Sequence, residues 1–450
     1  MSTYRFILRD YHAIQDADIV IDGITVLSGI NGCGKSTLSR WLYYVIKGTA
    51  EFENNLLHEY VDKLTAWVDR MVFVCKDIER IRKTGIAFQD SARGKLYEIQ
   101  EQLRGTGAYS RKQVDVARDL FLQALSIVTD TLEENLDEEM SEVRKERVMR
   151  YLNMKAEGKT IRQTITDFTE QASRWMDRLT TTLYNDMEQR EVSTFFRMLD
   201  RQFGLREDWP SNIQLEEDGV GIIDGHLSNL YNLRNAIYVD TPMSVTSDFT
   251  NNRFWNALRE MMTEENKSNE STEVKKLLLR IKKLLDGQAV LEKDDTSFRS
   301  PSLNYVSSDQ QIHIRLTEVA TGFKTFSYLQ RLLENGYLNE ETLLMIDEPE
   351  AHLHPQWIVE FARMLVLLHK VLGLKIMVAS HNPDMVLAIH DIANKEGILD
   401  HTCFYVARQS DTNRHAFSYE ALGHEIGEIF ESFNIAIDRI REYGAAGVSE

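Results

Sequence analysis

A glycine-rich octapeptide near the N-terminus constrains the fold more than any other feature. Residues 29–36 read GINGCGKS and match G-x-x-x-x-G-K-[ST], the P-loop, whose backbone N–H groups and lysine surround phosphate groups. Three short apolar runs, YRFIL, ADIVI and ITVLS, precede the loop, and STLSRWLYYVI after it has helical spacing. A strand that enters such a loop and continues as a helix is typical of an α/β fold, so we predict one.

The P-loop is expected to bind ATP together with Mg²⁺. Lys35 would bridge the β- and γ-phosphates, and the hydroxyl of Ser36 would serve the metal ion. The phosphate-binding candidates of this segment are Gly29, Asn31, Gly32, Cys33, Gly34, Lys35, Ser36 and Thr37.

An apolar run that ends in two acids supplies the second part of the predicted site. LLMIDEPEAHLHP, residues 343–355, places Asp347 and Glu348 at the end of a buried strand. Asp347 is expected to hold Mg²⁺ through water, and Glu348 to polarise the water that attacks the γ-phosphate. His352 and His354 form an H-x-H pair, but no third or fourth zinc ligand stands near them in the sequence.

Two further turns complete the predicted ATP site. The apolar run KIMVAS, 375–380, is followed by His381, a placement that suits a contact to the γ-phosphate. Upstream of Asp347, the small-residue turn Ala320-Thr321-Gly322 precedes a helical segment. The unpaired N–H groups at the start of that helix predict an anion site at Thr321 and Gly322.

The order of these motifs resembles that of soluble ABC ATPases of the SMC/OLD type. P-loop, long helical stretch, small-residue turn, DEPEAHLHP and SHNP follow one another as they do in that class, over residues 1–50 and 287–400. Within the class, the chain is similar to the ATPase subunits of bacterial anti-phage systems such as Septu and PARIS. The resemblance implies an ABC ATPase head with a mixed sheet and a large inserted helical domain.

Three assignments come from the resemblance alone. Thr321 stands in place of the signature serine that contacts the γ-phosphate and Gly322 follows it, although Phe323 and Lys324 depart from the usual Gly-Gln. In such families the turn of one subunit caps the ATP of another, which implies a homodimer or higher homo-oligomer with shared ATP sites. They also use a glutamine to sense Mg²⁺, and Gln89, after the apolar run GIAF, is the candidate.

The stretch between the motifs sets the predicted domain boundaries. From about residue 50 to 270, apolar residues recur three and four apart with charges between them, which indicates helices. Within this stretch LRNAIYVDTP, residues 233–242, is predicted to be a strand that returns to the sheet. We predict that 1–95 and 271–450 form one ATP-binding head and that 96–270 form a helical insert.

Composition narrows the classes of function. A formal net charge of −18 gives no support to a broad surface for nucleic acid. No stretch approaches the roughly 18 consecutive apolar residues of a membrane span. The N-terminus lacks a signal-peptide pattern, and the 3 cysteines have no zinc-type spacing. We therefore expect a cytoplasmic protein without a membrane partner.

Three outputs remain open for such an ATPase. The favoured one is an ATP-dependent switch or scaffold, with slow Mg²⁺-dependent hydrolysis, that holds and releases a separate effector (a nuclease or toxin) in antiviral defence. The alternative is an SMC- or RecF-like ATPase of DNA repair or maintenance, with DNA as its partner. A transporter subunit is disfavoured, because the stretch between Ser36 and Thr321 is far longer than in such subunits.

Overall fold

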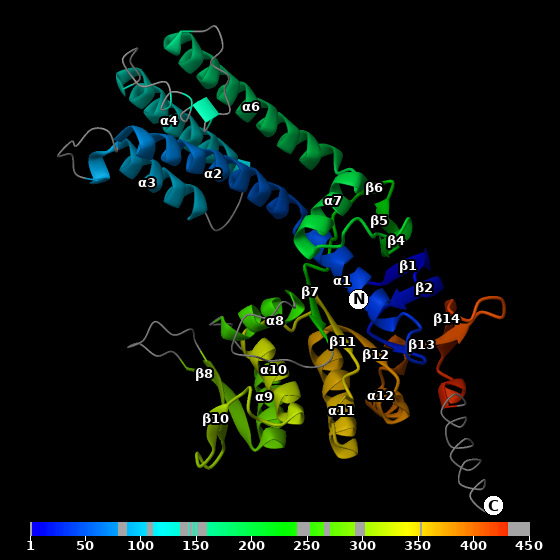
Figure 1. Cartoon of the computed structure of the whole chain (residues 1–450). Coiled ribbons are helices and arrows are strands. Elements are labelled where there is room, and N and C mark those ends of the chain that lie inside the picture. Colours follow the sequence, from blue (N-terminus) through cyan, green and yellow to red (C-terminus); the bar gives the residue numbers. More distant parts are fainter. Residues whose placement is uncertain are drawn as a thin grey trace, which may run out of the picture. The chain divides into compact units, whose positions relative to one another are not determined.

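The chain divides into two compact units. The computed structural model describes residues 2–79, 88–105, 111–135, 143, 146, 149–150, 160–240, 253–264, 271–292, 302–351 and 353–430 (Figure 1). The first unit comprises Met1–Ala50 and Leu199–Glu450, and the second comprises Glu51–Met198.

An eleven-stranded sheet organises the first unit. Its order is β6-β5-β4-β1-β2-β14-β13-β3-β12-β11-β7. The strands are β1 (Tyr4–Tyr11), β2 (Ile14–Ile21), β3 (Ile24–Ser28), β4 (Asn212–Glu217), β5 (Val220–Asp224), β6 (His226–Leu227), β7 (Asn235–Val239), β11 (Thr342–Asp347), β12 (Lys375–Ser380), β13 (Thr402–Gln409) and β14 (Phe417–Gly423). Neighbours from β13 to β7 pair in parallel, whereas β6-β5-β4-β1-β2 pair antiparallel. The prediction of an α/β fold with a mixed sheet is confirmed.

Helices cover both faces of the parallel strands. They are α1 (Lys35–Ala50), α8 (Arg253–Thr263), α9 (Thr272–Leu285), α10 (Thr321–Glu334), α11 (Pro355–Leu372) and α12 (Pro383–Glu396), with a short 3₁₀ turn η2 (Leu399–His401). Ile346 and Val378 belong to one core with α9, α10, α11 and α12. Met377 points to the opposite face, where its sulfur accepts from Ser39 of α1. Every residue of β3, β11 and β12 is buried, as expected for strands covered on both sides.

Local sequence explains where the helices of this unit begin and end. α11 and α12 both start with proline, at Pro355 and Pro383. The first N–H groups of a helix have no partner within the helix, so the N–H that proline lacks is not needed there. Gly373 and Gly397 end them with φ of 67° and 72°, a left-handed conformation that glycine adopts without strain. These prolines and glycines set where both helices begin and end.

A second, smaller sheet lies against α10. It contains β8 (Gly287–Glu292), β9 (Ser302–Ser307) and β10 (His313–Arg315), in the order β10-β9-β8. The amide of Gln330 on α10 accepts from Ala289 N (2.9 Å) and donates to Ala289 O (3.1 Å). This buried side chain thereby continues the hydrogen bonding of β8 and fixes the small sheet to the helix.

The second unit is helical in the part that the structure describes. It contains α2 (Phe52–Glu79), the 3₁₀ turn η1 (Phe88–Asp90), α3 (Ala92–Arg104), α4 (Arg111–Asn135), α6 (Ile161–Gln189) and the start of α7 (Val192–Phe203). α2 packs against α3, α4 and α6, which lie side by side in Figure 1. Trp67 of α2 packs against Phe121 of α4 and Trp175 of α6, so apolar stripes at helical spacing meet in one core. No helix among the described residues is long and apolar enough to cross a membrane.

The unit boundaries lie elsewhere than the predicted 96 and 270. α2 belongs to the helical unit, which therefore begins at Glu51, and the chain returns to the first unit at Leu199. Residues 212–239, expected to be helical up to the strand near 233–242, contain three more strands. Asp218 and Gly219 have φ of 50° and 79°, the two-residue turn that joins β4 to β5 as a hairpin. β4 then pairs with β1, so this segment adds to the large sheet.

Candidate ATP and magnesium site

The candidate site lies at the carboxyl ends of four adjacent parallel strands. In the order β3, β12, β11, β7 these strands end at the P-loop, at His381, at Asp347 and before Asp240. Parallel register aligns their ends: Ser28 pairs with Ser380, and Asp347 pairs with Ala379. Ligands of open α/β sheets bind outside the carboxyl ends of the strands, which is where the sequence-predicted groups gather.

The P-loop has the backbone that its glycines predict. Gly32 and Gly34 have φ of 83° and 96°, values that L-residues rarely adopt. Lys35 begins α1 and is buried, and its Nζ donates to the carbonyl oxygens of Gly29 (2.9 Å) and Ile30 (3.1 Å). The lysine thus closes the loop on itself, with its ammonium group at the centre of the loop.

The remaining P-loop candidates divide into surface and interior positions. Asn31 and Gly32 are exposed on the loop, and Ser36 and Thr37 are half-buried in the first turn of α1. Cys33 is fully buried: its carbonyl accepts from the hydroxyl of Tyr419 on β14 (3.3 Å). Cys33 therefore contributes its backbone N–H at most, because its side chain packs inward.

Gly34 offers a test of the loop. A Cβ at Gly34 would lie 2.7 Å from Ile14 Cγ1, whereas a Cβ at Gly32 would meet nothing within 4 Å. Both positions strain an L-residue by about 1–2 kcal/mol, and the contact with buried Ile14 adds about 1–3 kcal/mol. We expect Gly34→Ala to lower ATP affinity by about tenfold or more and to lower the melting temperature. Calorimetric titration and thermal melts measure both.

The matched control for that substitution is Gly32→Ala, which has the positive φ without the clash. Its effect on affinity and melting temperature should be smaller. Equal effects in the two variants would show that the contact with Ile14 does not matter and that only backbone strain does.

Asp347 is a buried carboxylate suited to a divalent cation. It is 6% exposed, and its Oδ2 accepts from the hydroxyl of Tyr238 (3.3 Å). Burial raises the pKa of Asp347, the charges of Glu348 and Asp240 raise it further, and the neighbouring Ser36 hydroxyl lowers it. A carboxylate that is desolvated and close to other acids is stabilised in its charged form by a cation. Oxygen donors from Ser36 and Asp347 therefore fit Mg²⁺, which prefers oxygen and keeps several waters.

Glu348 and His381 face each other across the ends of β11 and β12. Glu348 has φ of 46°, uncommon for a residue other than glycine, and its N–H donates to Ala379 O (2.8 Å). His381 Nδ1 lies 3.3 Å from Glu348 Oε1. The side chains of Glu348 and His381 are 31% and 43% exposed, so both remain accessible from solvent. A strained backbone at an accessible carboxylate is a feature that clusters at functional sites.

Three residues near Asp347 were missed by sequence reasoning. Tyr238 and Asp240 come from β7 and its end, and Arg40 of α1 donates to Asp240 Oδ1 (2.9 Å). Burial raises the pKa of Tyr238, and Asp347 raises it further. The run NAIYVD was recognised as a strand, but its sequence does not say that β7 pairs with β11. Asp240, an acid directly after a buried strand, was the sequence signal that could have placed this segment in the site.

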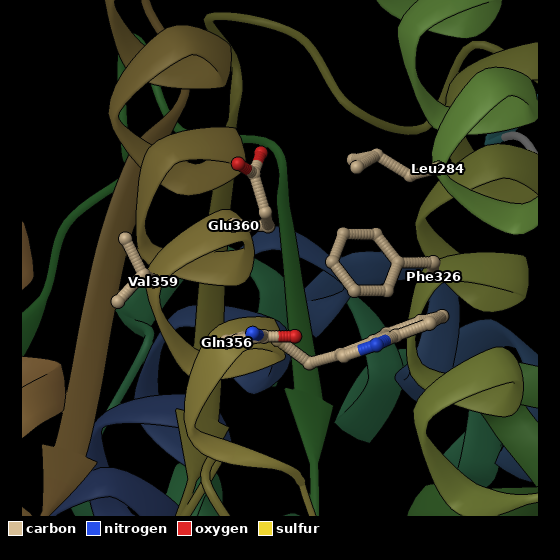
Figure 2. A pocket seen from close by; sticks show the side chains of 6 residues that line it. Leu284, Phe326, Gln356, Val359 and Glu360 are labelled. Carbon is tan, nitrogen blue, oxygen red and sulfur yellow. The ribbon is translucent and has the colours of Figure 1, made fainter.

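The turn Ala320–Gly322 begins α10, as predicted. Ala320 is the N-cap and makes no side-chain capping bond, and Thr321 and Gly322 are half-buried. A Cβ on Gly322 would lie 3.2 Å from Trp357 Cε3 and 3.4 Å from Leu353 Cδ2, so this position has room for little beyond glycine. Trp357 also lines a cavity of 530 Å³, shown in Figure 2, together with Leu284, Phe326, Gln356, Val359 and Glu360.

Gln89 and the H-x-H pair belong to other parts of the chain than the four strand ends. Gln89 lies in the helical unit, exposed in η1, so its role in sensing Mg²⁺ stays a prediction. His352 lies outside the described residues, and His354 is the N-cap of α11, where its Nδ1 accepts from Gln356 N (3.4 Å). Within the described part of the chain, no group of three or more His, Cys, Asp and Glu is arranged to hold a metal ion alone.

Comparisons with known proteins give one family and a set of solved structures. A family model described as "AAA domain, putative AbiEii toxin, Type IV TA system" matches residues 24–386. No curated protein matches. A Pyrococcus furiosus Smc head domain bound to the C-terminal domain of ScpA has 10% identity and a TM-score of 0.34, covering 98% of this chain and 100% of that one. The Thermotoga maritima SMC head domain has 11% identity and a TM-score of 0.34, covering 94% and 99%.

Proposed function

We propose that this chain is a slow Mg²⁺-dependent ATPase that switches a separate effector in antiviral defence. The chain belongs to the family described as "AAA domain, putative AbiEii toxin, Type IV TA system", and the proposal starts from that membership. The observation that carries the proposal is the meeting of Lys35, Asp347, Glu348 and His381 at the ends of adjacent strands. The family description names a toxin–antitoxin context, which supports a role in defence.

The residues of the site divide the work of phosphoryl transfer. Lys35 would leave the loop carbonyls of Gly29 and Ile30 and contact the β- and γ-phosphates. Ser36 and Asp347 would hold Mg²⁺, which supplies charge neutralisation on the phosphate oxygens. Glu348 would orient and deprotonate the attacking water.

The remaining contacts surround the γ-phosphate. His381 would contact it from the end of β12. Thr321 and Gly322 of a second subunit would contribute N–H groups from the start of α10. In that arrangement ATP joins two copies of the chain, and hydrolysis separates them. The output then depends on whichever protein recognises the joined state.

The shared ATP site predicts an ATP-dependent change in mass. Glu348→Gln with ATP and Mg²⁺ should have at least twice the mass of its nucleotide-free form, because the variant binds ATP and hydrolyses it too slowly to separate the subunits. Thr321→Glu in the same background places a negative charge where the phosphate of the partner would lie, and should keep the single-subunit mass while still binding ATP. Light scattering after size exclusion measures both.

The control for this test is Gln311→Glu, which adds the same charge at an exposed position between β9 and β10. It should assemble like its parent. Assembly of the Thr321 variant to the same extent would remove the turn from the interface.

The effector is tested by release. Tagged Glu348→Gln, purified from its host with ATP and Mg²⁺, should retain a nuclease or toxin, and wild-type protein should release the same partner as it hydrolyses ATP. A preparation that contains only the chain and DNA, with an ATPase rate stimulated by double-stranded DNA, would instead favour the DNA-maintenance alternative.

A further inference from the structure

Glu350 is a buried acid that the proposed reaction does not use. It lies in the turn after β11, and its side chain is 4% exposed. Its Oε1 accepts from Ser380 Oγ (2.8 Å) and from the backbone N–H of His381 (3.1 Å). Ser380 Oγ in turn accepts from Asn382 N (3.0 Å). Glu350 therefore ties the turn after β11 to the turn after β12.

Burying this carboxylate costs desolvation free energy that a purely structural contact between the two turns does not require. Among the described residues, its second oxygen, Oε2, has no hydrogen-bond partner. Desolvation raises the pKa of Glu350, as expected for an acid taken out of water. A glutamine would accept the same two hydrogen bonds without the desolvation of a charge. The acid is therefore unexplained by the contacts of Ser380 and the backbone.

The group that explains the acid is the imidazole of His381. Its Nδ1 lies 3.5 Å from Glu350 Oε1 and 3.3 Å from Glu348 Oε1, so the ring sits between two carboxylates. Among the described residues Nδ1 makes no hydrogen bond, so both carboxylates act on it through their charge, which bears on the nitrogen that carries the proton. Two acids beside Nδ1 favour a proton there, which leaves Nε2 as the atom turned to a ligand.

The same turn positions Glu348. Its left-handed backbone is held by Glu348 N to Ala379 O (2.8 Å) and by Ala351 N to Glu348 O (2.9 Å). Glu350 adds a tie from this turn to His381, the residue that Glu348 faces. Loss of the tie would let the ring and the strained carboxylate move independently.

We infer that Glu350 is a positioning residue, whose carboxylate fixes the orientation of His381 between itself and Glu348; the inference rests on the proposed ATPase function. It acts through His381 and does not touch ATP. Its effect is therefore expected on the chemical step and not on the binding of nucleotide.

The experiment compares Glu350→Gln with wild type in ATP affinity, kcat and melting temperature. The amide keeps the bonds from Ser380 and His381 N but removes the charge beside Nδ1. We expect kcat to fall about tenfold, the difference between a charged and a neutral acceptor, with ATP affinity unchanged within about twofold. Glu360→Gln, the same change on the surface of α11, should leave kcat unaltered.

A cycle with His381→Ala separates positioning from a structural role. If Glu350 acts through the imidazole, adding Glu350→Gln to His381→Ala should lower kcat no further. Additive losses, or a wild-type kcat in Glu350→Gln, would overturn the inference. Should Glu350→Gln not fold, Ser380→Ala takes its place, since it removes one tie to Glu350 and should show the same dependence on His381. A wild-type rate no higher than that of Lys35→Ala would instead mean that the proposed ATPase function has failed.

Discussion

Replacing Lys35 by alanine should abolish ATP binding. The side chain is buried, and its ammonium group is held by two carbonyl oxygens of the loop that it would exchange for phosphate oxygens. Two charge-assisted hydrogen bonds of about 1.5–3 kcal/mol each correspond to a loss of affinity of about 100-fold or more. Equilibrium binding of a fluorescent ATP analogue, displaced by ATP, measures the loss.

A second lysine on the same helix provides the control. Lys47, near the C-terminal end of α1, donates to Asn235 Oδ1 (3.2 Å) and lies away from the loop. Lys47→Ala should bind ATP with wild-type affinity. Near wild-type affinity in Lys35→Ala, with the fold intact by circular dichroism, would remove the P-loop from the nucleotide site.

Replacing Glu348 by glutamine should leave ATP binding intact and slow hydrolysis by about 10²–10³-fold. The amide has nearly the same shape, so it can keep the strained turn after β11, but it cannot take a proton from water. General-base catalysis by a positioned side chain contributes about 10²–10⁴-fold to enzymatic rates. Release of phosphate under saturating ATP measures the rate, and titration with ATP measures the binding.

The neighbouring acid distinguishes the two roles assigned to this pair. Asp347→Asn should weaken binding only when Mg²⁺ is present, because its carboxylate is expected to serve the metal ion. Glu348→Gln should bind ATP as tightly as the wild-type protein does, both with and without Mg²⁺. An unaltered rate in Glu348→Gln would exclude this residue from the chemistry and move the role of base to another group.

Local sequence pattern was sufficient to predict the candidate site residues that follow buried strands. The P-loop, Asp347, Glu348 and His381 each stand directly after a run of apolar residues, and the parallel register of β3, β12 and β11 brings them together. The pairing of β7 with β11 is a contact between segments that share no local pattern. For this reason Tyr238 and Asp240 were not assigned to the site, although their strand was recognised.

The helical unit shows the other limit of sequence reasoning. Helical spacing predicted α2, α4 and α6, but the same expectation extended over 212–232, where the Asp218-Gly219 turn marks a hairpin. Gln89 was chosen by its place after an apolar run, and the structure puts it in the helical unit. The assignment of Gln89 came from the order of motifs in the resembled family, and no predicted strand end supported it.

The place of β3 in the large sheet has a consequence for synthesis of the protein. Val26, at the middle of β3, pairs with Val378 on one side and Phe404 on the other, both near the opposite end of the chain. At about 5–20 residues per second, a ribosome needs tens of seconds between making β3 and making its neighbours. During that time an apolar strand, fully buried in the finished protein, has both edges unpaired. Until β12 and β13 have been made, β3 therefore lacks both of the strands that flank it in the finished sheet, and a fragment that ends before β12 lacks them permanently.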